Sequence, residues 1–231
     1  MPKLTHAQRL ELPKWSLAHN GWGDGSLYPG RKNNPACKYV GHGLEYSCAD
    51  GVTATFGKAG FPLVPMQPGM AEGYAYCPDA LAYGRRHKAV IDSWTAKVGD
   101  IILVDTGGGA QPGHTEVIYH VVGAGSGRKI FTVGWDSGPS NVDSYRGQGG
   151  VHRHSWSDPV GQGNPAIMAV LDADKVIDWA KVNQPAHNKH AAKRKRLRPA
   201  PIQKTPQGNL VTPPAAPEQS PPWFKRWLRH W

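Results

Sequence analysis

One helical segment followed by a series of short strands constrains the fold of this chain most strongly. Residues 47–59 place Val52, Phe56 and Ala59 on one helical face, and Gly60 is a typical helix end. After residue 99, β-rich segments alternate with Gly-rich turns, which indicates antiparallel pairing and an α+β fold. The predicted strands are 100–105, 115–122, 129–133, 150–156 and 166–171. Further helices are predicted near 5–17, interrupted by Pro13, and at 77–90, and the rest of the first 45 residues is predicted to be irregular.

The charge divides the chain into regions. Residues 181–231 hold 11 of the 27 Lys+Arg and one of the 17 Asp+Glu, so the whole net charge of +10 lies there. We expect a neutral domain at 1–180, an extended Pro/Ala-rich linker at 181–222 and a short tail at 223–231. As a helix, the tail would carry Trp on one face and Lys/Arg on the other. It could bind an anionic wall polymer or a membrane surface, or pack on its own domain, and both alternatives stay open.

The three cysteines, Cys37, Cys48 and Cys77, form no C-x-x-C pair. Their odd number argues against a disulfide framework, although Cys37 and Cys77 could pair with each other. The N-terminus lacks the apolar core of a secretory signal, and no apolar run is long enough to span a bilayer. We therefore expect synthesis in the cytoplasm without a signal peptide.

Cys48, His114 and Asp136 are the predicted catalytic residues. Cys48 lies at the predicted start of a helix, where the dipole favours a thiolate and lowers the cysteine pKa. Its backbone N–H could also face an oxyanion. His114 begins a predicted strand after a loose loop. The strand would hold its side chain rigidly at an end open to substrate, where it could act as the base that takes the thiol proton. Asp136 ends the next strand and could orient the imidazole.

Four motifs resemble the CHAP family, the cysteine- and histidine-dependent amidohydrolases/peptidases. They are Tyr46-Ser-Cys-Ala-Asp-Gly-Val, Val98-Gly-Asp-Ile-Ile-Leu-Val-Asp, Gly113-His-Thr-Glu-Val and Thr132-Val-Gly-Trp-Asp. The resemblance spans about residues 44–138. It implies a papain-like fold in which the helix carrying the cysteine packs on an antiparallel sheet, and it implies cleavage of amide bonds in peptidoglycan. The order of segments is similar to bacteriophage endolysins of actinobacterial phages, which act at the cell wall after release from the host cytoplasm.

The resemblance has limits in the third catalytic region. Many members have Glu or Asn there, whereas this chain has Gly134 and Asp136, which leaves Asp136 as the predicted third member. The stretch before Cys48 lacks the acidic spacing of calcium-binding members, so we expect no metal and no cofactor. Tyr46 and Trp135 are candidate substrate contacts, with packing in the core as the alternative for Trp135. The sequence does not distinguish an amidase from an endopeptidase, and we expect a monomer.

Two alternative functions are a zinc-dependent hydrolase and a non-enzymatic binding protein. A zinc hydrolase could use His152 and His154, which share one face of a predicted strand, with Cys37 or His42. No third ligand stands at a recognisable spacing. A non-enzymatic protein could bind nucleic acid or another anionic polymer through its basic tail. Because the domain is neutral and carries no nucleic-acid-binding signature, we expect no specific nucleic-acid partner.

Overall fold

The predicted α+β class is confirmed by a computed structural model in which helices pack on one antiparallel sheet. The structure describes residues 2–22, 34–41, 47–105, 110–123, 128–137, 150–157 and 167–182. The predicted linker beyond residue 182 and the tail at 223–231 lie outside these ranges.

The sheet has six strands in the order β1-β6-β2-β3-β4-β5, and every neighbouring pair is antiparallel. The predicted pairing of the strands on either side of residues 123–127 is therefore confirmed. In β3 and β4, Glu116 lies opposite Gly134 and Val117 lies opposite Val133. The strands are β1 (Val90–Ile91), β2 (Ile101–Val104), β3 (His114–Val122), β4 (Lys129–Ser137), β5 (Gly150–Ser157) and β6 (Ile167–Leu171).

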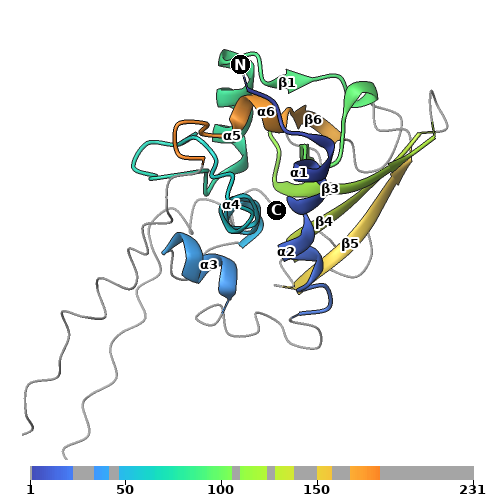
Figure 1. Cartoon of the computed structure of the whole chain (residues 1–231), viewed down its shortest axis with the longest axis horizontal. Coiled ribbons are helices and arrows are strands. Elements are labelled where there is room, and N and C mark those ends of the chain that lie inside the picture. The colour runs from blue at the N-terminus through green and yellow to red at the C-terminus, as the bar shows by residue number, and fades with distance from the viewer. Residues whose placement is uncertain are drawn as a thin grey trace, which may run out of the picture. The chain divides into compact units, whose positions relative to one another are not determined.

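Helices flank this sheet, and several lie on one side of β3, β4 and β5 (Figure 1). The predicted helices over 47–59 and 77–90 are confirmed as α4 and α5, with earlier ends. The segment predicted near 5–17 forms two helices separated at Pro13, which has no N–H to continue the first. The helices are α1 (His6–Glu11), α2 (Lys14–Leu17), α3 (Pro35–Val40), α4 (Ser47–Lys58), α5 (Cys77–Arg86), the 3-10 helix η2 (Ser93–Thr95) and α6 (Ala173–Val176).

The helix α3 corrects the prediction that the segment before residue 45 is irregular. Asn34 caps it by accepting hydrogen bonds from the backbone N–H groups of Ala36 and Cys37, and Pro35 occupies its first turn. Gly41 ends it in a left-handed conformation, with φ +88°. The cap and stop signals were present in the sequence, but the helix is too short to show an apolar period.

The helix α4 is the centre of the main core. Val52 and Phe56 are buried on it, as the periodicity predicted, beside Ile101, Leu103 and Val117 of the sheet. A second buried cluster, with Ile102, Ile118, Ile130 and Trp156, fills the other face of the sheet. Both faces of β2 are therefore buried, which explains its unbroken Ile-Ile-Leu-Val sequence.

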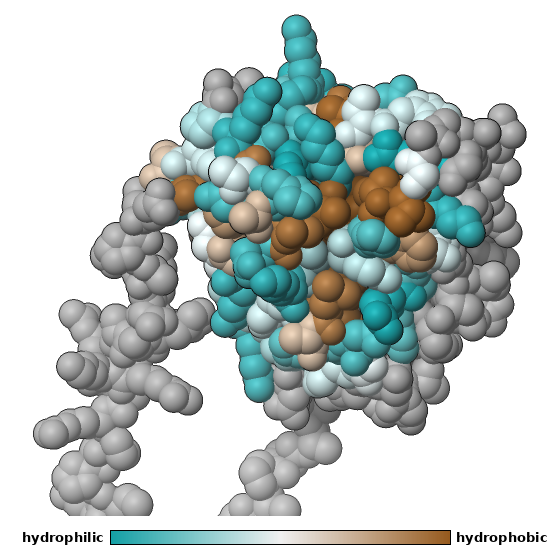
Figure 2. Space-filling model, turned by 45° about the vertical axis from the view of Figure 1, so that its right-hand side comes forward, coloured by the Kyte–Doolittle hydropathy of each residue, from teal (hydrophilic) through white to brown (hydrophobic). Residues whose placement is uncertain are grey.

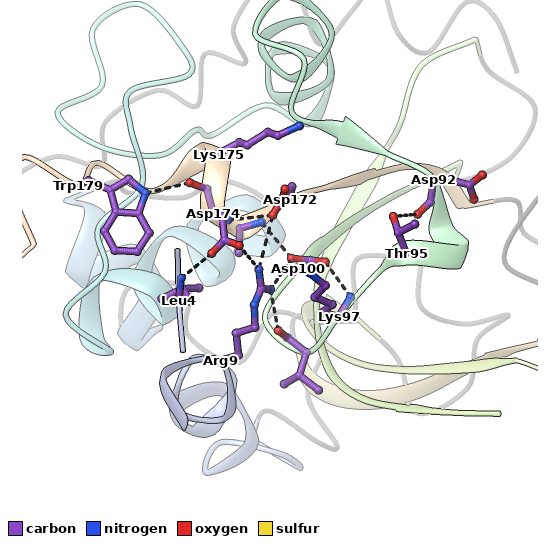
Figure 3. A network of polar contacts seen from close by, with 12 residues as sticks. Leu4, Arg9, Asp92, Thr95, Lys97, Asp100, Asp172, Asp174, Lys175 and Trp179 are labelled. Carbon is purple, nitrogen blue, oxygen red and sulfur yellow. Dashed lines mark hydrogen bonds and ion pairs between the residues drawn. The ribbon is translucent and has the colours of Figure 1, made fainter. Parts of the chain in front are cut away.

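An N-terminal clasp, formed by Arg9, Asp100, Asp172 and Asp174, ties the first helix to the sheet and to α6 (Figure 3). Arg9 Nη1 lies 2.8 Å from Asp100 Oδ1, and Nη2 lies 2.6 Å from Asp174 Oδ2. Asp100 also accepts hydrogen bonds from the backbone N–H groups of Lys97 and Ala173. Asp100 belongs to the Val98-Gly-Asp motif, so this part of the motif has a structural role.

The surface of the described residues carries both hydrophilic and apolar side chains. On the face shown in Figure 2, apolar side chains form small patches between hydrophilic ones. Among the described residues, the most exposed large apolar side chain is Tyr76, at 56%. None of the helices in the described ranges is both long and apolar enough to cross a membrane.

Candidate active site

Cys48 is the second residue of α4, and its side chain is 6% exposed. Backbone N–H groups in the first turn of a helix have no partner within the helix, so they are available to an anion near the sulfur. The predicted position of Cys48 at a helix start is thus confirmed.

His114 is the first residue of β3, and its imidazole hydrogen-bonds the Cys48 side chain. It is buried, since β3 is an interior strand flanked by β2 and β4. Its Nε2 lies 3.0 Å from Glu116 Oε1, which leaves Nδ1 as the ring nitrogen for the sulfur. The structure therefore brings together the two residues that the sequence analysis placed at the centre of the chemistry.

Glu116 is a further residue in contact with His114, and no motif of the sequence singled it out. It lies two residues after His114, and residues i and i+2 of a strand point to the same face. Its side chain is fully buried and contacts His114 directly. A His-x-Glu pattern at the start of a strand was the signal that could have found it.

Gly134 provides the space for this carboxylate. A Cβ atom at Gly134 would lie 2.6–2.8 Å from Oε1, Cγ and Cδ of Glu116, so the Glu116 side chain lies directly over the glycine. Gly134 stands at the position where the CHAP motif that this sequence resembles often has Glu or Asn. Here a carboxylate from the neighbouring strand fills that space.

Three donors surround the Glu116 carboxylate. Oε1 lies 3.0 Å from His114 Nε2 and 2.6 Å from His154 Nδ1, and Oε2 accepts a hydrogen bond from the Thr132 hydroxyl. Trp156 Nε1, which can only donate, lies 2.7 Å from Thr132 Oγ1. The hydroxyl proton of Thr132 is therefore directed to Glu116, which acts as an ionised acceptor.

The pKa values agree with this assignment. Burial alone would raise the pKa of Glu116, but His154 and His114 outweigh it and hold that pKa far below its usual range. Burial likewise opposes a charge on His114, but its hydrogen bonds to Cys48 and Glu116 raise its pKa to about 10. The ionised forms of Cys48 and Glu116 therefore stabilise the His114 imidazolium.

Cys48 departs from the prediction that the helix start lowers its pKa. The adjoining Cys77 side chain and burial raise that pKa well above its ordinary value, and the hydrogen bond from His114 offsets this only in part. The sequence analysis missed this because nothing in the spacing brings Cys77, at the start of α5, beside Cys48. No disulfide joins Cys37, Cys48 or Cys77, so the bond between Cys37 and Cys77 that the sequence left open is not formed.

The structure describes the side chain of Trp135, a predicted substrate contact, but not that of Asp136, the predicted third catalytic residue. The Trp135 indole is 1% exposed, stacks on Trp15 with ring centroids 4.9 Å apart, and donates to Ser16 Oγ. A Cβ atom at Gly51 of α4 would clash with the indole. Trp135 therefore packs directly against α4 and does not line a groove. Asp136 is a backbone member of β4, but its side chain lies outside the described part of the chain, as does Tyr46.

The zinc alternative relied on His152 and His154 with Cys37 or His42. His154 instead hydrogen-bonds Glu116, and His42 lies outside the described residues. Within the described ranges, no group of three or more His, Cys, Asp or Glu side chains is arranged to hold a metal ion. No observation in the described chain favours this alternative.

Comparison with known proteins does not identify a family for this chain. The sequence matches no protein-family model, and no curated protein or solved structure resembles it significantly.

Proposed function

We propose that this protein is a cysteine hydrolase that cleaves amide bonds in peptidoglycan peptides, with a papain-like CHAP fold and the role of a phage endolysin. The observation that carries the proposal is the contact series from Cys48 through His114 to Glu116. A nucleophile, a base and a group that orients the base form the constellation of acyl-transfer enzymes. The substrate class comes from the resemblance of the four motifs.

The protonation of the Cys48–His114 pair determines when the sulfur can attack. The neighbouring Cys77 and burial raise the pKa of Cys48 and favour the thiol, whereas His114 favours the thiolate. Transfer of the thiol proton to His114 gives the thiolate–imidazolium pair, which is the reactive form. We therefore expect kcat/KM to increase as the pH rises above neutrality, until the imidazolium itself deprotonates.

The catalytic steps follow from these positions. The Cys48 sulfur attacks the amide carbonyl carbon, and the oxyanion lies near the free N–H groups at the start of α4. The C–N bond breaks while His114 gives its proton to the leaving amine. Water then attacks the thioester, His114 takes a proton from it, and the acid product leaves with regeneration of the thiolate. Glu116 stays ionised and orients the imidazole throughout.

The decisive test compares cysteine variants on purified cell walls. Cys48→Ala should abolish the release of new amino groups, whereas Cys37→Ala, which removes another buried thiol, should retain activity. Mass spectrometry of the products would identify the bond that is cut. Full activity of a folded Cys48→Ala protein would reject the proposal.

The basic segment is proposed to bring the domain to an anionic wall polymer or membrane. Replacing Lys193, Arg194, Lys195 and Arg196 by Gln removes four of the +10 charges without touching the catalytic residues. We expect slower lysis of whole cells at low salt, with unchanged turnover of a small soluble muropeptide. Equal lysis by both proteins would show that these charges do not recruit the enzyme.

A further inference from the structure

The shortest hydrogen bond that Glu116 makes to an imidazole is not the one to the catalytic histidine. His154 Nδ1 lies 2.6 Å from Oε1, whereas His114 Nε2 lies 3.0 Å from the same oxygen. His154 is 3% exposed, and it comes from β5, two strands away from β3. The cysteine chemistry proposed above gives this second imidazole no role.

The strand register explains how His154 reaches the carboxylate. His154 lies opposite Thr132 in β4, and Gly134 lies opposite Glu116 in β3. With no side chain at Gly134, Glu116 extends over β4 until it meets Thr132 and His154. The carboxylate is therefore held by donors from two strands besides its own.

These donors determine what Glu116 can do for His114. A carboxylate held only by His114 could rotate about its last side-chain torsion, which has a broad energy profile. Hydrogen bonds from Thr132 to Oε2 and from His154 to Oε1 fix both the rotation and the position of the group. They also favour the ionised form, because every one of them is donated to the carboxylate.

We propose that His154 is a positioning residue of the active site: it holds Glu116 as an oriented carboxylate and so keeps the His114 Nε2–H directed away from Cys48. His154 donates its Nδ1–H to the carboxylate and acts on the chemistry through Glu116. The inference rests on the proposed function for its effect on turnover, but its geometry can be tested without substrate.

Three substitutions separate positioning from simple packing. His154→Ala removes the donor, His154→Asn keeps an N–H near the position of Nδ1, and His154→Gln places its amide near Nε2 instead. Losses of about 10- to 100-fold are typical when a partner that orients a catalytic side chain is removed. We expect His154→Ala and His154→Gln to lose roughly this much kcat with little change in KM, and His154→Asn to recover most of it.

Each variant is to be assayed below its own melting temperature, so that unfolding does not lower the rate. A purely structural role predicts the same kcat per folded molecule in all three variants. Either that result, or equal activities for His154→Asn and His154→Gln, would overturn the proposal.

A spectroscopic measurement on the full chain without substrate distinguishes this proposal from the proposed function. The Nε2–H proton of His114 is buried in its hydrogen bond to Glu116 and so exchanges slowly with water. It should give a downfield NMR signal that disappears in His114→Ala. We expect the signal to be lost or shifted in His154→Ala and retained in His154→Asn. An unchanged signal in His154→Ala would refute the positioning role, whether or not the protein cleaves peptidoglycan.

Discussion

Asp100, directly before β2, and Glu116, in β3, are two buried carboxylates, and they are neutralised in different ways. Asp100 pairs with the guanidinium of Arg9 at 2.8 Å, whereas Glu116 pairs with the imidazoles of His114 and His154. Both accept several hydrogen bonds, as buried charges must. The first carboxylate holds the N-terminal clasp together, and the second orients a candidate base.

The difference lies in whether the partner can release a proton. Arg stays charged at every pH at which the protein is folded, so the clasp loses its ion pairs only where its carboxylates are protonated; burial raises the pKa of Asp100. Imidazole can gain or lose its charge within the working range, which is what proton transfer requires. A cation that keeps its proton suits a structural connection, while a titratable one suits chemistry.

Removal of the clasp cation should have the largest effect on stability. Arg9→Met leaves the buried Asp100 and the partly buried Asp174 without this counter-charge, and removing one partner of a buried ion pair costs about 3–5 kcal/mol. Urea unfolding at pH 7 would measure this loss. Lys14→Ala is the matched control, because the exposed Lys14–Glu11 pair should contribute under about 1 kcal/mol. Equal effects of the two variants would show that the clasp does not stabilise the fold.

The histidine side of the comparison should appear as a pH dependence of stability. The His114 pKa is raised from about 6.5 in the unfolded chain to about 10 in the folded protein. Its contribution is therefore complete below pH 6.5 and is lost as the pH rises toward 10. At about 1.4 kcal/mol per pKa unit, the loss approaches about 5 kcal/mol by pH 10.

Unfolding free energies measured at several pH values would reveal this decline. Between about pH 6.5 and 8, below the ordinary pKa of a cysteine, it should be absent from His114→Ala and retained in His120→Ala, which replaces an exposed histidine of the same strand. A decline in that range that persists in His114→Ala would assign it to another group.

Neutralising the site carboxylate should affect turnover more than folding. Glu116→Gln keeps the size of the side chain but removes the charge that stabilises the His114 imidazolium. A hydrogen bond to a charged group contributes about 1.5–3 kcal/mol, which corresponds to roughly a 10- to 100-fold loss of kcat. Steady-state kinetics on soluble muropeptides would test this, with Asp100→Asn as the contrasting variant that loses stability instead. Full activity of Glu116→Gln would exclude Glu116 from the mechanism.

The smallest expected effect concerns the glycine under Glu116. Gly134→Ala places a methyl group within 2.6–2.8 Å of the Glu116 side chain and should cost about 1–2 kcal/mol of stability. The cost should disappear when Glu116→Ala is added, because the space is then free. A double-mutant cycle by thermal unfolding measures this coupling. Additive effects would mean that the two residues do not compete for the same space.

The local signals of the sequence were sufficient for the elements that position Cys48 and His114. Apolar spacing predicted α4, and alternation of β-rich segments with Gly-rich turns predicted β2 to β6. The order of a helix start and a strand start then placed nucleophile and base together. Short elements such as β1 and α3 were missed because two to six residues show no reliable period.

The partners of these two residues depend on contacts that no local pattern reveals. That Glu116 reaches over Gly134 follows from a strand register that includes an irregularity between Ile118 and His120. That Cys77 adjoins Cys48 depends on how α5 packs beside α4. Burial and neighbouring groups then reversed the expected direction of the Cys48 pKa. Distances between distant segments, not residue types, were the missing information.

The N-terminal clasp has a consequence for how the domain is made. Arg9 and Asp174 are 165 positions apart in sequence, and Leu4 donates its backbone N–H to the same aspartate. Contacts of such long range form late and slow the folding of small domains. During synthesis, the first helix cannot be secured until Asp174 has left the ribosome, by which time Cys48, His114, Glu116 and His154 have all been translated. The clasp thus completes the domain only after every proposed active-site residue is present.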